Sequence, residues 1–142
     1  MQENTKVECI TVEATIDNMM SVLDLAENLL TEAQCPLPMI TRFLLSIEEI
    51  YVNVASYAYG DQIGDCRIQY TLSDQSLAID VWDHGIPFNP LEREDPDVTL
   101  KAEERKIGGL GIFMTKTMMD EISYEYKDGQ NHIWMKKSWA ES

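Results

Sequence analysis

The sequence predicts an α+β two-layer sandwich, a fold with one layer of helices and one layer of sheet. The first observation is the order of the predicted elements, which runs strand, helix, helix, strand, strand, long loop, helix, strand, strand. Helices grouped between pairs of strands are typical of an α+β fold, whereas a doubly wound sheet alternates strands and helices one by one. The second observation is the length of 142 residues, which suits one ordinary domain, so we expect a single domain over residues 1–142.

The N-terminal half of the chain predicts one strand and two helices. Residues 6–15 are rich in β-branched side chains and predict a first strand at the edge of the sheet. Apolar side chains then recur at helical spacing over roughly residues 17–34, after which two prolines close the helix. The same helical period resumes after Pro38 and continues to near Gly60, which predicts a second helix.

The C-terminal half predicts two hairpins separated by a long loop and a helix. Two alternating segments flank residues 74–75, and the second strand of this hairpin ends at Asp83. Residues 84–107 contain three prolines and an acidic cluster without a sustained apolar period, which predicts a long loop. Loops of that length in a compact domain are usually functional. A glycine-rich helix start follows, and a last hairpin turns at residues 128–129.

The charge of the chain argues against one class of function. Asp and Glu number 25 against 11 Lys and Arg, which gives a formal net charge of −14 and a pI near 4.3. Nucleic-acid binding depends on attraction between phosphates and basic side chains, so we expect no nucleic-acid partner. A strong acidic charge serves solubility, and it also attracts basic protein partners.

Neither the cysteines nor the apolar segments predict a metal or a membrane. The three cysteines are widely spaced and lack a metal-binding spacing, so we expect no disulfide and no zinc. No run of about 18 apolar residues is present, and the polar N-terminal segment differs from a secretion signal. We therefore expect a cytoplasmic protein without membrane association.

The first candidate site is a carboxylate and an amide on the second predicted helix. Glu49 and Asn53 are four residues apart and therefore project from the same face. A carboxylate can orient or deprotonate an attacking hydroxyl, and an amide oxygen suits an Mg²⁺ ion held mainly by phosphates and water. Taken alone, the pair also fits an ordinary exposed helix face, with Glu48 rotated toward solvent.

The second candidate site is the segment DHGIPFNP, which directly follows a predicted strand. Asp83 at the strand end can accept a hydrogen bond from an adenine amino group. Gly85 lacks the Cβ that would keep a flat base away from the backbone, and Phe88 can supply an apolar wall. For this segment alone, an ordinary Asp-X-Gly turn is the alternative.

The third candidate site is a glycine run between the long loop and a helix, formed by Gly108, Gly109, Leu110 and Gly111. Free backbone amides and the positive end of the helix dipole would face a phosphate there. The spacing is neither that of a P-loop nor that of a dinucleotide-binding fingerprint. A plain helix entry is the alternative for this run alone.

Together, EExxxN on a helix, DxGxxFNP after a strand, a long loop and GGLG opening a helix resemble the Bergerat-fold ATPases, which include type II topoisomerases and sensor histidine kinases. The resemblance spans nearly the whole chain and is strongest to the serine/threonine kinases that act as bacterial anti-sigma factors. It implies a Bergerat sandwich with helices on one face of a mixed, mostly antiparallel sheet. It also implies ATP and Mg²⁺ as ligands.

The same resemblance assigns roles to individual residues. Glu49 would be the catalytic base, Asn53 the Mg²⁺ ligand and Asp83 the residue that recognises adenine. Gly85 and Phe88 would lie beside the base.

The resemblance also makes the loop over residues 90–107 an ATP lid. Phosphate contacts would come from its cations and from the glycine run: Lys101, Arg105, Gly108, Gly109, Leu110 and Gly111. For the two cations, pairing in solvent with the acidic residues between them is the alternative. Two positions depart from the family pattern, since Tyr57 stands where many relatives carry a histidine and His84 where an acidic or amide residue is commoner.

The resemblance implies a kinase that transfers the γ-phosphoryl group of ATP to a serine or threonine of a small anti-anti-sigma partner, and that binds a sigma factor. It also implies a homodimer. The alternative is a non-catalytic, ATP-dependent switch that sequesters a regulatory protein, and the presence of Glu49 argues against it. A sensor histidine kinase is disfavoured, because the two histidines, His84 and His132, do not lie on predicted dimerisation helices.

Overall fold

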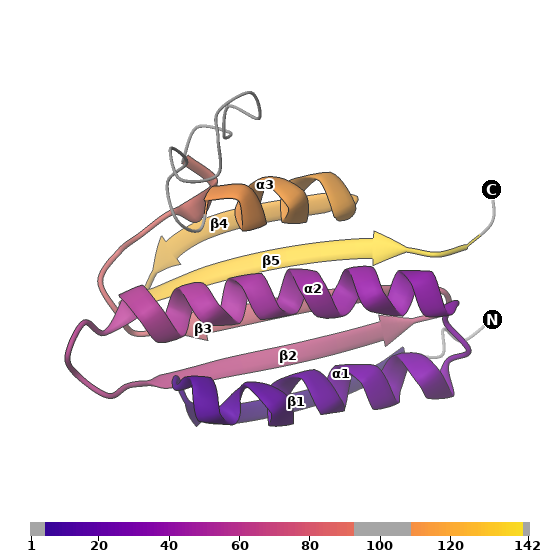
Figure 1. Ribbon diagram of the computed structural model, residues 1–142, viewed down its shortest axis with the longest axis horizontal. Coiled ribbons are helices and arrows are strands. Elements are labelled where there is room, and N and C mark those ends of the chain that lie inside the picture. Colours follow the sequence, from indigo (N-terminus) through magenta and orange to yellow (C-terminus); the bar gives the residue numbers. More distant parts are fainter. Residues whose placement is uncertain (1–4, 93–108, 141–142) are drawn as a thin grey trace.

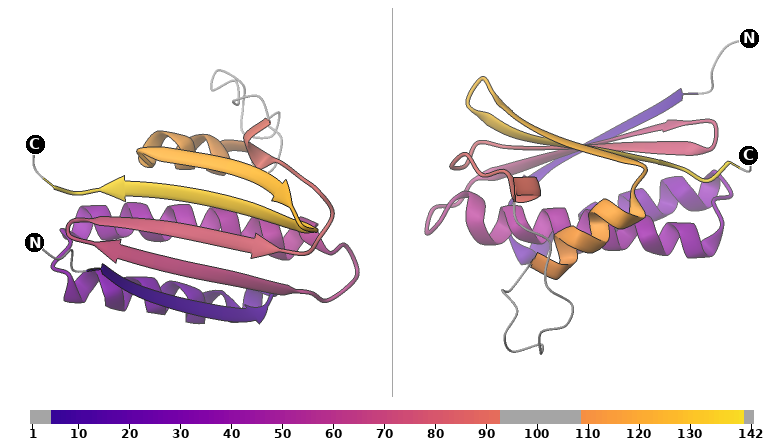
Figure 2. Two further views of the ribbon diagram at one scale, coloured as in Figure 1. Left: turned by 180° about the vertical axis from the view of Figure 1, so that it is seen from behind. Right: turned by 90° about the horizontal axis from the view of Figure 1, so that it is seen from above.

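The computed structural model describes residues 5–92 and 109–140, and of residues 109–111 it describes the backbone only. Five strands form one sheet, and the helices lie on a single face of it (Figure 1). Seen from above, the helices and the sheet form two separate layers (Figure 2). The expected α+β two-layer sandwich is confirmed.

The strands follow the order β1-β2-β3-β5-β4 across the sheet. Their bounds are β1 Thr5–Glu13, β2 Asp65–Ser73, β3 Ser76–Asp83, β4 Glu121–Lys127 and β5 Gln130–Ser138. All four pairings are antiparallel, so the parallel pairing of the expected mixed sheet is not found among these strands. The reason is that β3 and β4 run in the same direction, but the last hairpin inserts β5 between them.

Three helices form the second layer: α1 Met19–Glu32, α2 Leu37–Asn53 and α3 Gly109–Met118. The first two are joined by a short connection that contains Pro36, and α3 packs beside α2. A short 3₁₀ turn over Ile16–Asn18 precedes α1. None of the described helices combines the length and apolar character needed to span a bilayer.

Both hairpins turn where the sequence predicts. Asp74 has a φ of 49°, and in the second turn Asp128 and Gly129 have φ values of 54° and 77°. Asp and Gly adopt this left-handed conformation more readily than other residues, which fits their use in tight turns. The registers of β2 with β3 and of β4 with β5 follow from these turns.

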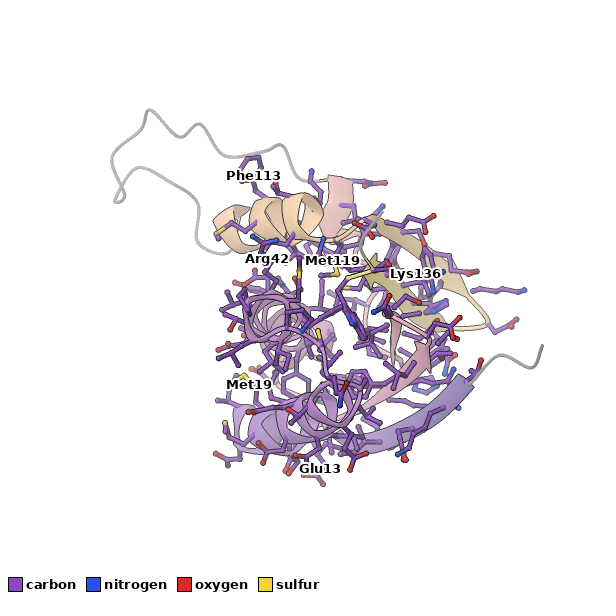
Figure 3. All side chains as sticks on the ribbon, turned by 90° about the vertical axis from the view of Figure 1, so that its right-hand side faces the viewer. Glu13, Met19, Arg42, Phe113, Met119 and Lys136 are labelled. Atoms are coloured by element: carbon purple, nitrogen blue, oxygen red, sulfur yellow. The ribbon has the colours of Figure 1, made fainter. Side chains whose placement is uncertain are left out.

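The core lies between the helix layer and the sheet, where side chains from both fill the space (Figure 3). Met119, which directly follows α3 and is labelled in Figure 3, is 5% exposed and belongs to the core. The buried tyrosines satisfy their hydroxyls on the backbone: Tyr70 donates to Val22 O at 2.9 Å and Tyr51 to Thr15 O at 2.6 Å. Tyr51 therefore ties α2 to the segment that leads from β1 into α1.

In the described residues no helix covers the other face of the sheet (Figure 2). The ring of Trp82 stacks on His132 with centroids 4.8 Å apart, and the Arg67 guanidinium lies 4.8 Å from the centre of the same ring. His132 Nε2 is 2.7 Å from Asp80 Oδ2. Such cross-strand contacts stabilise neighbouring strands. They join β2, β3 and β5 directly before β3 ends at Asp83.

Candidate functional site

A pocket opens at the C-terminal end of α2, beside β3, β4 and β5. Its empty space is about 390 Å³, part of it open to solvent. The structure brings together three residues of the predicted site from two distant segments. Asn53, Asp83 and Phe88 line this pocket together with Tyr57, Tyr124 and Asn131.

Glu49 and Asn53 lie one turn apart near the end of α2, as their spacing predicts. Asn53 Nδ2 donates to Glu49 Oε1 over 3.1 Å and to the Glu49 backbone carbonyl over 2.7 Å. Because Nδ2 makes both bonds, the amide oxygen Oδ1 is the group left to face a ligand. Asn53 is 9% exposed and lines the pocket. The pocket therefore has an uncharged oxygen beside a carboxylate.

That oxygen fits a magnesium ion only when other ligands complete its shell. No cluster of three or more His, Cys, Asp or Glu that could hold a metal is found among the described residues. Mg²⁺ commonly binds through one or two protein oxygens and takes its remaining ligands from phosphates and water. The donor set at Asn53 is of this kind, and it does not suit a metal held by the protein alone.

The second predicted helix ends near Gly60, but its last turn is not α-helical. After Asn53 the chain forms a π-helix over Val54–Ala58, a widened turn that is frequent at functional sites. At its end the Ala58 carbonyl accepts a hydrogen bond from Ile86 N at 2.9 Å. The end of the α2 segment and the loop after β3 are thus joined through their backbones.

Asp83 is the last residue of β3 and is 6% exposed. Its Oδ1 accepts hydrogen bonds from Gly85 N at 2.8 Å and from Asn131 Nδ2 at 2.9 Å. Within the described part of the chain both hydrogen bonds fall on Oδ1. The second oxygen, Oδ2, remains available as an acceptor in a residue that lines the pocket.

Gly85 has a structural role that the sequence does not reveal. A Cβ at this position would lie 2.1 Å from the Ala58 carbonyl oxygen and 2.5 Å from its carbon. These are backbone atoms of the π-helix, so they cannot move aside as a flexible side chain would. Glycine is therefore required for the approach of the loop to α2, whether or not a base also lies there.

Asn131 lines the pocket and was not predicted from the sequence. It lies on β5 opposite Asp83 and is 5% exposed. Besides its bond to Asp83, its Nδ2 donates to Ile86 O at 2.9 Å and to Gly85 O at 3.5 Å. Its Oδ1 accepts from Phe88 N at 3.1 Å and from the Tyr124 hydroxyl. One side chain thereby fixes the whole loop from the strand end to Phe88.

Two groups near the Asp83 carboxylate stay protonated near neutral pH. Burial raises the pKa of the Cys66 thiol to about 12, and the nearby charge of Asp83 adds to the effect. Burial is also the main reason why the pKa of Tyr124 is raised, so its hydroxyl remains a donor to Asn131. Because the thiolate is the reactive form of cysteine, Cys66 is a packing residue and not a nucleophile.

The two positions that depart from the family pattern lie at the rim. Tyr57 is 42% exposed and lines the pocket. His84 is exposed, its backbone N donates to the Tyr59 hydroxyl at 2.8 Å, and its Nε2 is 2.9 Å from the Gln130 side-chain nitrogen. The ring of His84 is therefore held against β5 at the edge of the site.

Part of the predicted phosphate side lies outside the described residues. This applies to Lys101, Arg105 and Gly108, and to all of the predicted lid beyond Glu92. The backbone of Gly109, Leu110 and Gly111 forms the first residues of α3, as the helix-entry pattern predicts. On that helix Phe113 projects from the side facing away from α2 (Figure 3).

Comparison with known proteins gives relatives that are named serine-protein kinases. Serine-protein kinase RsbW of Listeria monocytogenes serovar 1/2a is 29% identical over 97 residues, which are 65% of this chain and 62% of the relative. Serine-protein kinase RsbW of Bacillus cereus (strain 03BB102) is 29% identical over 96 residues, 65% of this chain and 60% of the relative. This chain therefore matches about three fifths of the length of these relatives.

A solved structure supports the fold. The crystal structure of the RsbU and RsbW domains of a Mycobacterium tuberculosis protein matches with a TM-score of 0.68, over 94% of this chain and 32% of that chain. The sequence identity is 17%, so the likeness concerns the fold alone.

The family with the description "Histidine kinase-like ATPase domain" matches residues 12–137, a range that includes all three motifs and the whole pocket. The match agrees with the two-layer fold and with the convergence of Asn53 and Asp83 on one pocket. The chain therefore belongs to the histidine kinase-like ATPase family, as its motifs indicated.

Proposed function

We propose that this chain binds ATP with Mg²⁺ in the pocket and transfers the γ-phosphoryl group to a serine or threonine of a partner protein. The observation that carries the proposal is the carboxylate of Asp83. It is buried, its Oδ1 is held by two donors, and its Oδ2 remains to accept a hydrogen bond in a mostly apolar pocket. A flat base with an exocyclic amino group, such as adenine, satisfies that requirement.

The apolar wall of the pocket supports the same ligand. Phe88 and Ile50 contribute to the lining, and burial of a base against such side chains excludes water from the hydrogen bond to Asp83. Asn131 keeps the loop in place through its bonds to Gly85, Ile86 and Phe88. These hydrogen bonds within the chain give the proposed base site its shape.

We assign the chemical step to Glu49. Its Oε1 accepts from Asn53 Nδ2, which orients the carboxylate from the same helix that holds the amide. A carboxylate so placed would align an incoming hydroxyl and accept its proton. Asn53 would hold Mg²⁺ through Oδ1, where the ion offsets the charge of the phosphates.

The relatives are named as serine-protein kinases, which supports a protein as the phosphoryl acceptor. We propose that the chain acts in the cytoplasm as an anti-sigma factor, that it binds a sigma factor, and that an anti-anti-sigma protein is the phosphoryl acceptor. We further propose that residues 1–142 form one domain and that the chain works as a homodimer.

The test measures binding and transfer on the same preparations. Wild type should gain thermal stability with ATP and Mg²⁺, because a ligand at a hundredfold excess over Kd adds about 2.7 kcal/mol to the native state. Glu49→Gln should keep ATP affinity and lose transfer to the acceptor by roughly 10²-fold or more. Glu48→Gln, the same change one residue earlier, is the matched control and should transfer normally.

The outcomes separate the alternatives. Transfer at the wild-type rate by Glu49→Gln would remove the catalytic-base role. ATP binding by wild type without transfer to a cognate acceptor would point instead to the non-catalytic binding switch. No thermal shift with saturating ATP and Mg²⁺ would overturn the nucleotide assignment itself.

A further inference from the structure

Exposed apolar side chains gather at one end of the molecule. Of the ten large apolar side chains that are exposed in the described residues, five lie on three segments at this end. They are Ile63 (74% exposed), Ile86 (65%), Met20 (60%), Ile16 (53%) and Tyr57 (42%). We call these five residues the sheet-end patch. Exposed apolar side chains that gather on one part of a surface often mark an interaction site.

Backbone contacts hold the three segments together. Ala14 N donates to Gly64 O at 2.8 Å, which places the start of α1 beside the loop that precedes β2. Ile86 N donates to Ala58 O at 2.9 Å, which places the loop after β3 beside the π-helix. The end of β1, the end of α2 and the end of β3 lie at the same side of the molecule, on the left in Figure 1.

The sheet-end patch begins at the mouth of the pocket. Tyr57 and Ile86 belong to the patch and also line the pocket. A molecule that covers the patch would therefore lie next to a bound nucleotide. This location separates the patch from Leu37, an equally exposed apolar side chain that begins α2 at the other end of the helix layer.

The three segments that carry the patch hold acidic residues and no lysine or arginine. Residues 13–20, 54–65 and 84–92 contain five carboxylates and neither lysine nor arginine. The carboxylates belong to Glu13, Asp17, Asp61, Asp65 and Glu92. The surface is therefore apolar with an acidic surround, and it attracts a partner of opposite charge.

We propose that the sheet-end patch docks a protein partner whose contact surface carries apolar side chains among lysines and arginines. A second copy of this chain would bring the same carboxylates against each other, so self-association through the patch is opposed by charge. Nucleic acid is excluded by the same acidic surround. The proposal deepens the partner binding of the proposed function, on which it rests, by naming the surface and the chemistry of the partner.

The test uses two designed peptides as probes. Each is an amphipathic helix of about 18 residues, roughly five turns, with leucine on one face and either lysine or glutamate on the other. Amide chemical shifts of the labelled full chain are followed during titration. The Leu/Lys peptide should perturb amides of residues 14–20, 57–64 and 84–87, and the Leu/Glu peptide should leave them unchanged.

Variants identify the contact. Ile63→Ser combined with Ile16→Ser should weaken binding of the Leu/Lys peptide at least tenfold, whereas Leu37→Ser should bind it as wild type does. Leu37 is a matched control because it is 73% exposed against 74% for Ile63. Asp17→Lys combined with Asp61→Lys should reverse the preference toward the Leu/Glu peptide. Dispersed amide spectra check that each variant is folded.

Three results would overturn the proposal. The first is peptide-induced changes in amide shifts that are confined to the open face of the sheet. The others are an equal loss of peptide binding in the Leu37→Ser control, and self-association of the chain that Ile63→Ser abolishes. The ATP-induced thermal shift is measured on the same variants. Loss of peptide binding with a retained ATP response supports docking at the patch. If wild type lacks the ATP response, the proposed kinase function fails, while the peptide result still decides the docking proposal.

Discussion

Replacement of Asp83 by asparagine should change which purine the pocket accepts. Two donors, Gly85 N and Asn131 Nδ2, point at Oδ1, so an amide at this position must place its oxygen there. The amide NH₂ then occupies the place of Oδ2 and faces the ligand. The acceptor for an adenine amino group becomes a donor, and two donors oppose each other.

The expected loss follows from the value of a hydrogen bond to a charged group, about 1.5–3 kcal/mol. Asp83→Asn should therefore weaken ATP binding by roughly tenfold to a hundredfold. Inosine triphosphate carries a carbonyl acceptor in place of the amino group, so the variant should bind it better than wild type does. Calorimetric titration of both nucleotides into both proteins gives a double-mutant cycle with a measurable coupling.

The matched control is Asp80→Asn, the same change on the same strand. Asp80 faces the open side of the sheet and pairs with His132, so this variant should bind both nucleotides as wild type does. Unchanged ATP affinity of Asp83→Asn would refute the contact between Asp83 and the adenine amino group. An equal loss of affinity for both nucleotides would also refute this contact, because it indicates a collapsed pocket.

Three further expectations concern the surroundings of the pocket. Asn131→Ala removes five hydrogen bonds. It should lower the free energy of unfolding, measured by urea titration, by about 2–4 kcal/mol, since each bond contributes about 0.5–1.5 kcal/mol net and some partners bond to water instead. A loss below about 0.5 kcal/mol would contradict the role of Asn131 in holding the loop. Gly85→Ala places a Cβ against the Ala58 carbonyl, so its melting temperature should fall even without nucleotide, and an unchanged value would be contrary evidence. Burial raises the pKa of Cys35 to about 11 and that of Cys66 to about 12, so iodoacetamide at mildly alkaline pH should label exposed Cys9 alone in the native protein, as mass spectrometry would detect.

Local patterns predicted the elements well because short-range contacts determine them. The turn at residues 128–129 needs residues that accept a positive φ, and Asp-Gly supplies them. The apolar period of α2 predicts its buried face, since Phe43, Ile47 and Ile50 all lie in the core. The position of Asp83 at the end of β3 follows in the same way from alternation along one strand.

Features that depend on distant contacts could not be predicted. Asn131 lies opposite Asp83 only because β5 inserts between β3 and β4, and nothing near Asn131 in the chain indicates this pairing. The π-helix over Val54–Ala58 continues the apolar period of α2, which gives no sign of a widened turn, and its contact with the loop after β3 joins residues far apart in the chain. The roles assigned to Lys101 and Arg105 concern residues outside the described part of the chain, and they stay predictions.

The contact between Ala58 and Gly85 links two motifs that lie far apart in the chain. Because the carbonyl of the one occupies the space that a side chain of the other would need, the shape of the π-helix and the identity of residue 85 are under a shared constraint. Among related sequences, a larger residue at the position of Gly85 should occur only where the turn at residues 54–58 has changed its length. Evolution of this pocket should therefore proceed by paired changes, and the invariance of such a glycine would record a packing requirement as much as a nucleotide contact.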